Sequence, residues 1–227
     1  MYNVIYGVIA IVILAVLAFV FNPNIIFLGL AVLLAVILIK RNADLKKNIY
    51  KTPEDALHIV NVDKGGVFQL RGVGKNMEDM TLKVMSKHLY QQGDYYWWEL
   101  ECDKGHGEKV WVEVEDDDDT VVSVVLEKLK LTDIHTSALG LTKIDDEEEG
   151  SVFYDRVKYN YEDSDEAIFY RHCDDSKPEK FYYWDFVNGN HSVSVEKWGE
   201  KDYEVFYCQI MQPSQVTVLA TKSGEVK

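Results

Sequence analysis

Residues 110–115 of this chain read VWVEVE, and apolar and polar side chains alternate from residue 112 on. Residues 192–198 read SVSVEKW in the same way, and residues 95–100 (YYWWEL) and 181–186 (FYYWDF) are rich in aromatic side chains. Successive side chains of a β-strand point to opposite faces, and aromatic and β-branched residues favour strands. Glycine and acidic clusters separate the runs, and Asn188-Gly189 is typical of a hairpin turn. The pattern predicts a mainly β, antiparallel domain.

The runs recur in the same order in two parts of the chain. A segment GGVF at 65–68 or GSVF at 150–153 comes first, and an aromatic run and an alternating run follow it. Equivalent segments are offset by 85, 86 and 81 residues. We therefore expect two tandem β units, residues 61–130 and 145–221, with a connector over 131–144 that can form a short helix. Chance recurrence of common strand residues is the alternative.

The N-terminal part of the chain has a different character. The first 39 residues contain no charged side chain and are interrupted only by Asn22-Pro23-Asn24. A membrane-spanning helix needs roughly 20 apolar residues, and proline ends or kinks a helix. We expect a transmembrane α-helical hairpin over residues 1–41 and a basic juxtamembrane linker with a short helix over 42–60. A cleaved signal peptide fits less well, because neither a basic start nor a small-x-small cleavage site is evident.

The charge after the hairpin predicts its orientation. Residues 40–51 carry a net charge of +4, and basic residues beside a membrane helix stay on the cytoplasmic side. We expect a multi-pass protein of the bacterial inner (cytoplasmic) membrane with both termini in the cytoplasm. In the second helix Ala31 and Ala35 form a small-xxx-small pair suited to helix pairing. The residues placed to contact lipid headgroups are Lys40, Arg41, Lys46 and Lys47.

The remainder of the chain is strongly acidic. The whole chain carries −14, so that residues 52–227 carry −18 once the +4 of the basic segment is separated. Such a domain is repelled by nucleic acid, which we exclude as a main partner. The expected partners are the membrane and other membrane or cytoplasmic proteins, including a second copy of the chain. Three cysteines, an odd number, in a cytoplasmic domain predict free thiols.

No pattern nominates a catalytic residue, a cofactor or a metal site. The acidic run at 116–119 lacks the spaced pattern of a calcium-binding loop. Cys102 and His106 are spaced to share a metal with His172 or Cys173, but no Cys-x-x-Cys pair supports this. We therefore predict no metal, no cofactor and no catalytic residues. A metal- or small-molecule-dependent enzyme with its site between the two β units is the alternative.

Aromatic side chains are the strongest candidates for contact with a partner. In a run of consecutive aromatic residues, alternate rings face opposite sides of the sheet. One side can form the core, and the other either packs between the two units or forms a binding surface, where Tyr and Trp are enriched. The interface candidates are Tyr95, Trp97, Trp98, Trp111, Tyr183, Trp184 and Trp198.

Several of these segments resemble the bacterial DUF4178 family. They are residues 95–100, 111–115 and the stretch from 183 to 216, in which VEKWG at 195–199 is the most specific piece. The resemblance covers about residues 62–219. It implies a β-rich fold, and the association of the family with genes for membrane-stress and phage-shock-like proteins implies a membrane-associated assembly. The family is a domain of unknown function, so no residue role carries over.

These observations together predict a membrane-anchored, non-enzymatic adaptor or assembly subunit. Its acidic, β-rich interaction domain would face the cytoplasm within a membrane-stress-related complex. A two-span partner of membrane-microdomain scaffolding proteins, of the NfeD type, is a further alternative. Those proteins carry one smaller domain, whereas about 175 residues follow the basic segment here.

Overall fold

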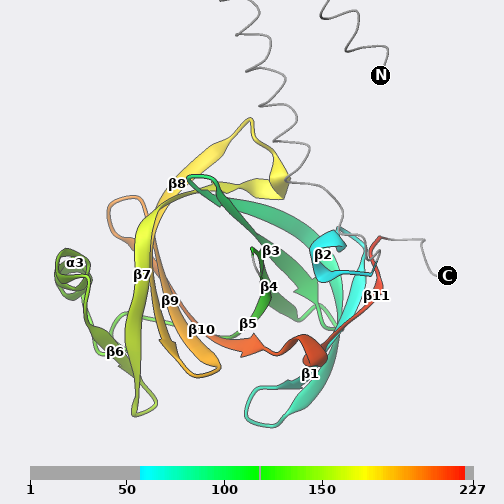
Figure 1. The fold of residues 1–227 in the computed structure, drawn as a ribbon, viewed down its shortest axis with the longest axis horizontal. Coiled ribbons are helices and arrows are strands. Elements are labelled where there is room, and N and C mark those ends of the chain that lie inside the picture. The colour runs from blue at the N-terminus through cyan, green and yellow to red at the C-terminus, as the bar shows by residue number, and fades with distance from the viewer. Residues whose placement is uncertain (1–56, 118, 223–227) are drawn as a thin grey trace, which may run out of the picture. The chain divides into compact units, whose positions relative to one another are not determined.

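A computed structural model describes residues 57–117 and 119–222, which form a mainly β domain as predicted (Figure 1). No helix among these residues is long and apolar enough to cross a bilayer. The predicted hairpin and most of the juxtamembrane linker lie outside the described residues. The same holds for the predicted pairing and headgroup residues, Ala31, Ala35, Lys40, Arg41, Lys46 and Lys47.

Eleven antiparallel strands form one sheet in this part of the chain. The first five are β1 (Val67–Val73), β2 (Glu78–Gln92), β3 (Tyr95–Asp103), β4 (Lys109–Asp116) and β5 (Thr120–Leu129). The others are β6 (Ser151–Tyr154), β7 (Val157–Tyr170), β8 (Pro178–Asn188), β9 (His191–Trp198), β10 (Asp202–Met211) and β11 (Val216–Ala220). Helix α3 (Ala138–Glu147) lies between the two sets, and the short 3₁₀ turns are η1 (Ile59–Asn61), η2 (Arg171–Cys173) and η3 (Pro213–Gln215).

The sheet closes on itself. Its strand order is β11-β1-β2-β3-β4-β5-β10-β9-β8-β7-β6, and β2 pairs in addition with β7. This pairing joins the eight strands β2–β5 and β7–β10 into a ring, which Figure 1 shows nearly end-on. One seam of the ring, between β5 and β10, runs from Leu129↔Val205 to Val122↔Met211. The other seam has only the pairs Leu89↔Tyr170, Tyr90↔Phe169 and Gln91↔Ile168.

The two halves of the domain have the same strand arrangement. Strands β1 to β5 follow one another across the sheet, and β6 to β10 do so in the opposite direction, so that β5 meets β10. The recurring sequence segments fall on equivalent strands of the two halves. The Gly-x-Val-Phe segments reach β1 and β6, the aromatic runs form β3 and β8, and the alternating runs form β4 and β9.

Each half buries its own apolar cluster on the outer side of the ring. The cluster of the first half includes Phe68, Leu82, Leu100, Val112 and Val124. That of the second half includes Leu141, Val152, Trp184, Phe186 and Val195. Helix α3 supplies Leu141, and it begins at Ser137, whose hydroxyl accepts a hydrogen bond from the backbone N–H of Gly140 at 3.2 Å. A third, aromatic cluster lies within the ring and includes Tyr90, Trp97, Phe169, Phe181 and Tyr183.

The close approach of backbone segments at Gly66 gives a test of this packing. A Cβ at this position would lie 2.7 Å from the carbonyl oxygen of Thr221 and 2.9 Å from that of Asp63. Because backbone atoms cannot move aside cheaply, we expect Gly66→Ala to lower the free energy of unfolding by about 1–3 kcal/mol. Chemical denaturation of the detergent-solubilised full chain measures the loss.

The matched control for this substitution is Gly150→Ala. The nearest neighbours of a Cβ there are all side-chain atoms of Ile144, which is half-buried and can change rotamer. We expect this variant to lose less stability than Gly66→Ala. Equal losses would contradict the close backbone approach at Gly66.

Candidate functional site: an acidic cavity within the strand ring

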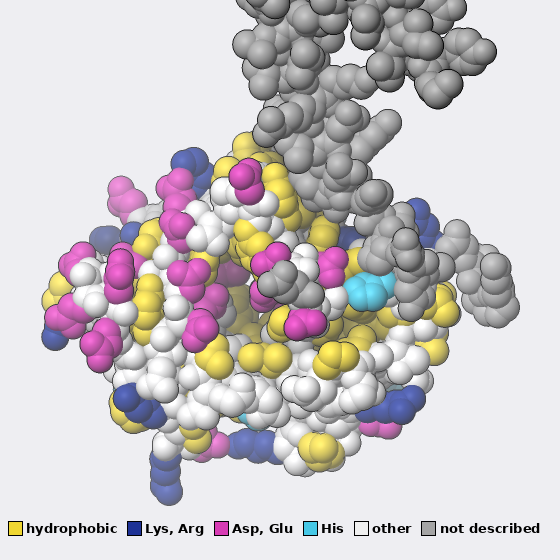
Figure 2. Space-filling view, viewed as in Figure 1, with side chains coloured by type: hydrophobic (Ala, Val, Ile, Leu, Met, Phe, Trp, Pro, Cys, Tyr) yellow, Lys and Arg dark blue, Asp and Glu magenta, His cyan; other side chains and the backbone are white. Residues whose placement is uncertain are grey.

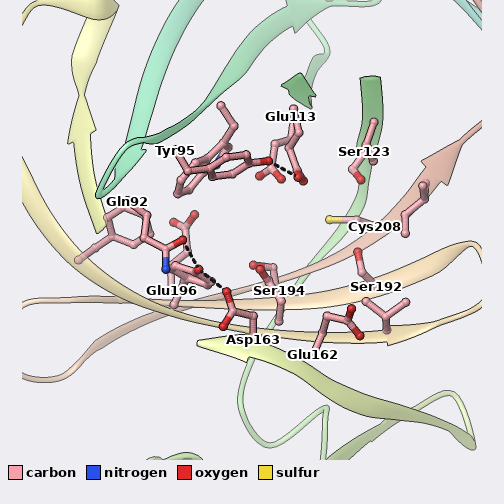
Figure 3. A pocket seen from close by; sticks show the side chains of 18 residues that line it. Gln92, Tyr95, Glu113, Ser123, Glu162, Asp163, Ser192, Ser194, Glu196 and Cys208 are labelled. Atoms are coloured by element: carbon pink, nitrogen blue, oxygen red, sulfur yellow. Dashed lines mark hydrogen bonds between the residues drawn. The ribbon is translucent and has the colours of Figure 1, made fainter. Parts of the chain in front are cut away.

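Inward-facing side chains of the ring enclose a cavity of about 270 Å³, to which all eight ring strands contribute (Figure 3). Its acidic lining residues are Glu113, Glu115, Glu162, Asp163, Asp185 and Glu196. Its aromatic lining residues are Tyr95, Trp97, Phe181 and Tyr183. No lysine or arginine of the described residues lines it. We call this space the acidic cavity.

The alternation in β4 explains why carboxylates face the interior. Val112 and Val114 are buried in the apolar cluster of the first half. Because successive side chains of a strand point to opposite faces, Glu113 and Glu115 are turned into the ring. In β9, Val193 and Val195 pack outward in the same way while Ser194 and Glu196 point inward. The outer apolar clusters therefore determine which side chains line the acidic cavity.

The strand register sets carboxylates beside one another. Glu113 lies directly opposite Glu99 of β3 and opposite Ser123 of β5. On the facing wall, Glu196 lies directly opposite Glu204 of β10. Like charges at directly opposite positions of neighbouring strands destabilise a sheet. Each of these two pairs is therefore unfavourable whenever both of its carboxyl groups are ionised.

Some of these carboxylates accept hydrogen bonds from aromatic residues. The Tyr95 hydroxyl donates to Glu115 Oε2 at 2.6 Å, and the Tyr183 hydroxyl donates to Asp163 Oδ2 at 2.8 Å. The indole N–H of Trp198 donates to Glu196 Oε2 at 3.0 Å. Of the other residues that the structure describes, none donates a hydrogen bond to the carboxylate of Glu113.

Burial shifts the protonation of the enclosed carboxyl groups. It raises the pKa of Glu99 to about 7, with a further contribution from the charge of Glu101. Burial likewise raises the pKa of Asp185 to about 7 and, together with the charge of Glu99, that of Glu196 to about 8. The pKa of Glu113 is also well above its ordinary value, through burial and then the charge of Glu115. Near neutral pH the interior thus carries carboxyl groups that readily exchange protons.

A second cavity, of about 420 Å³, adjoins the first, and Glu196 lines both. We call it the paired cavity, because two cations lie in it beside carboxylates. The Lys128 ammonium pairs with Glu204, and the Arg171 guanidinium lies 3.5 Å from Glu179. The remaining lining residues are Tyr90, Glu99, Trp111, Phe169, Trp198, Asp202 and Phe206.

The structure divides the seven aromatic interface candidates between two faces. Tyr95, Trp97 and Tyr183 line the acidic cavity, and Trp111 and Trp198 line the paired cavity. Trp98 and Trp184 are instead buried in the outer apolar clusters, where neither indole N–H has a hydrogen-bond partner. Five of the candidates therefore face the interior of the ring.

The residues considered for a metal site are not found in either cavity lining. Cys102 is buried in the apolar cluster of the first half, and His106 is exposed in the turn between β3 and β4. The Nδ1 atom of His172 lies 2.5 Å from the hydroxyl oxygen of Ser86. Within residues 57–117 and 119–222, no three His, Cys, Asp or Glu side chains are grouped so as to hold a metal ion. Cys102, Cys173 and Cys208 are free thiols.

The acidic lining was not predicted from the sequence. The available signal was the presence of Glu113, Glu115 and Glu196 in strands whose apolar side chains had to face a core. That alternation does not say whether the opposite face meets water or an enclosed space.

Comparison with known proteins adds a family. A family model described as "Domain of unknown function (DUF4178)" matches residues 77–213. The matched segment includes every strand of the ring, from β2 to β10. No curated protein and no solved structure matches the chain. The resemblance noted in the sequence is confirmed over the matched residues.

The raised pKa values predict that stability falls as pH rises. In an unfolded chain the carboxyl groups have their ordinary pKa values, so that they lose their protons near about pH 4. The folded protein keeps protons on Glu99 and Asp185 up to about pH 7, and on Glu196 up to about pH 8. Between about pH 4 and pH 8 the folded state therefore binds more protons than the unfolded state. Its stability is greatest below this range and decreases as the pH rises to about 8.

We expect Glu196→Gln to weaken this pH dependence, since the amide removes one titrating group but keeps an acceptor for Trp198. At pH 8 the variant should gain on the order of a few kcal/mol of stability, because each unit of a raised pKa corresponds to about 1.4 kcal/mol. Thermal unfolding between pH 5 and pH 9 measures both effects. Glu149→Gln, at an exposed position after α3, is the matched control and should leave the slope unchanged. An identical slope in Glu196→Gln and the unmodified protein would contradict the assignment.

Proposed function

Because the chain belongs to the DUF4178 family, whose description names no activity, we propose a function from the interior of the ring. The protein acts by binding, as a membrane-anchored, non-enzymatic adaptor or assembly subunit. The observation that carries this proposal is the acidic cavity, which is lined by six carboxylates and four aromatic rings. Such a lining favours the positively charged part of a partner. The exposed Glu162 and Asp163 attract a cation, and the enclosed carboxyl groups can lose their protons and pair with it in a site of low dielectric.

The N-terminal sequence supports the location that we propose. Its 39 uncharged residues and the basic segment after them favour two membrane spans with both termini in the cytoplasm of a bacterium. The partners are then other membrane or cytoplasmic proteins, or a second copy of the chain. The family resemblance favours a membrane-stress-related assembly as their setting.

We also propose that the domain arose by duplication of a five-strand unit. The equivalent strand orders of β1–β5 and β6–β10 support this, as do the recurring segments that fall on equivalent strands. In this arrangement each unit keeps its own apolar cluster, and the acidic cavity lies between the two units.

One observation favours a second candidate, a small-molecule enzyme with its site in the same space. Carboxyl groups with pKa values of about 7 to 8, such as Glu99, Asp185 and Glu196, are suited to general acid–base catalysis near neutral pH. A bound metabolite detected by native mass spectrometry, together with a monomeric protein, would favour this candidate over the adaptor.

Gentle extraction of the tagged protein from its native membrane tests the adaptor function. We expect a complex larger than the monomer, with the same crosslinked partner recovered in repeated preparations. Glu113→Gln should reduce recovery of that partner several-fold, because it removes an ionisable carboxyl group from the lining of the acidic cavity. Glu149→Gln should recover the partner normally. A lone monomer that crosslinks to nothing in cells would disprove the adaptor function.

A further inference from the structure

The paired cavity shows how this protein holds a positive charge. The Lys128 ammonium lies 5.5 Å from the centre of the Phe206 ring and pairs with Glu204. The guanidinium of Arg171 lies 5.2 Å from the centre of the Phe169 ring and 3.5 Å from Glu179. In both cases a cation lies near an aromatic ring and a carboxylate together. Each arrangement combines a cation–π contact with an ion pair.

The acidic cavity repeats this combination without a cation. Glu115 lies directly opposite Trp97 on the neighbouring strand, and Glu196 lies directly opposite Tyr183. The Trp97 ring stands near-perpendicular to that of Tyr183, with ring centres 6.2 Å apart. Glu113, which accepts no hydrogen bond from the described residues, shares this cavity. Aromatic rings and carboxyl groups thus line the same cavity, together with no cation from the described residues.

We propose that the acidic cavity is a binding site for an elongated organic cation that bears two or more alkylammonium groups. Glu113 and Glu196 release their protons to solvent as the ammonium groups enter and then pair with them, and Trp97 and Tyr183 contact the alkyl chain between the two ammonium groups. The inference rests on the proposed function in one respect, namely that both assign binding to the interior of the ring. It goes further, because it names the chemistry of the ligand.

The composition of the lining favours an organic cation over a metal ion. A hard metal ion needs several oxygen ligands that converge within about 2.0–2.6 Å of one point. No such group of three acidic or histidine side chains occurs among the described residues. Aromatic walls, by contrast, stabilise ammonium groups and their alkyl chains.

The placement of the acids favours an elongated ligand. They come from β4 and β7 as well as from β8 and β9, and Glu196 continues the row into the paired cavity. The two cavities, of about 270 and 420 Å³, together reach the size of pockets for small organic ligands, roughly 300–1,000 Å³. One ammonium group cannot neutralise carboxylates on several strands, whereas a chain with spaced amines can.

The site is open to solvent. Figure 2 shows a hollow near the middle of this face, with acidic and hydrophobic side chains gathered around it. Glu162 and Asp163 line the acidic cavity and are exposed. Exposed acids at an entrance attract a cation before it enters the enclosed part of the site.

Isothermal titration calorimetry of the detergent-solubilised full chain tests the proposal, with spermidine as the probe at low ionic strength. We expect saturable binding that Glu113→Gln weakens at least ten-fold and that Glu149→Gln changes less than two-fold. Ser123→Lys is a second variant, because it places an ammonium group opposite Glu113 on the adjacent strand. It should abolish spermidine binding while the protein stays folded, as judged by circular dichroism.

A tetralysine peptide distinguishes the two sources of alkylammonium groups. Binding of spermidine with the expected dependence on Glu113 assigns the site to a free polyamine. Binding of tetralysine alone, with the same dependence, supports the site and assigns its ammonium groups to lysine side chains of a protein. The proposal is overturned if neither probe binds, if Glu149→Gln weakens binding as much as Glu113→Gln, or if magnesium displaces the probe equally well. The protein could also yield a partner complex from membranes and yet bind neither spermidine nor tetralysine. That result would support the adaptor function and overturn this inference.

Discussion

The pairing of β2 with β7 is the constraint on which the rest of this structure depends. It consists of three residue pairs, and the side chains on both sides of it make further contacts. The Tyr90 and Phe169 rings have centres 4.9 Å apart, and the Tyr170 hydroxyl donates to Gln91 at 2.9 Å. Without this seam the sheet would be open, and Glu99, Glu113 and Glu196 would lie in bulk water with ordinary acidity. Closure turns a row of surface carboxylates into an enclosed set of carboxyl groups with raised pKa values.

The domain tolerates that interior because its two larger apolar clusters lie on the outer side of the ring. In many closed sheets the apolar side chains fill the inside, whereas here Val112, Val114, Val193 and Val195 pack outward. Each outer cluster stabilises the strands of its own half, so that inward positions such as Glu113 and Glu196 take no part in apolar packing. Carboxyl groups then accumulate at Glu99, Glu113, Glu196 and Glu204, although burying such groups side by side costs stability. Groups that cost stability and are nonetheless kept together are typical of functional sites.

The sequence predicted much of the local structure of this domain. The alternating and aromatic runs became β4, β9, β3 and β8, and the region near the predicted connector holds α3. Ring closure could not be predicted, because Tyr90 and Phe169 are far apart in the chain and their pairing depends on the curvature of the whole sheet. The site could not be predicted either. The alternating sequence indicates that Val112 and Glu113 face opposite sides of the sheet. Only the outer apolar cluster in the structure shows that Glu113 is on the enclosed side. For the same reason the sequence did not indicate that Trp97 lies inside the ring and Trp98 outside it.

Closure of the ring has a consequence for self-association. An open sheet of this size would offer long free edges, and unpaired backbone groups on such edges template pairing with other chains. In the described sheet the terminal strands are β6 and β11, with four and five residues. Short edges of this kind give an incoming strand few backbone groups to pair with. The domain can therefore reach a high local concentration with little risk of edge-to-edge aggregation. A second copy would have to bind through side chains rather than by extending the sheet.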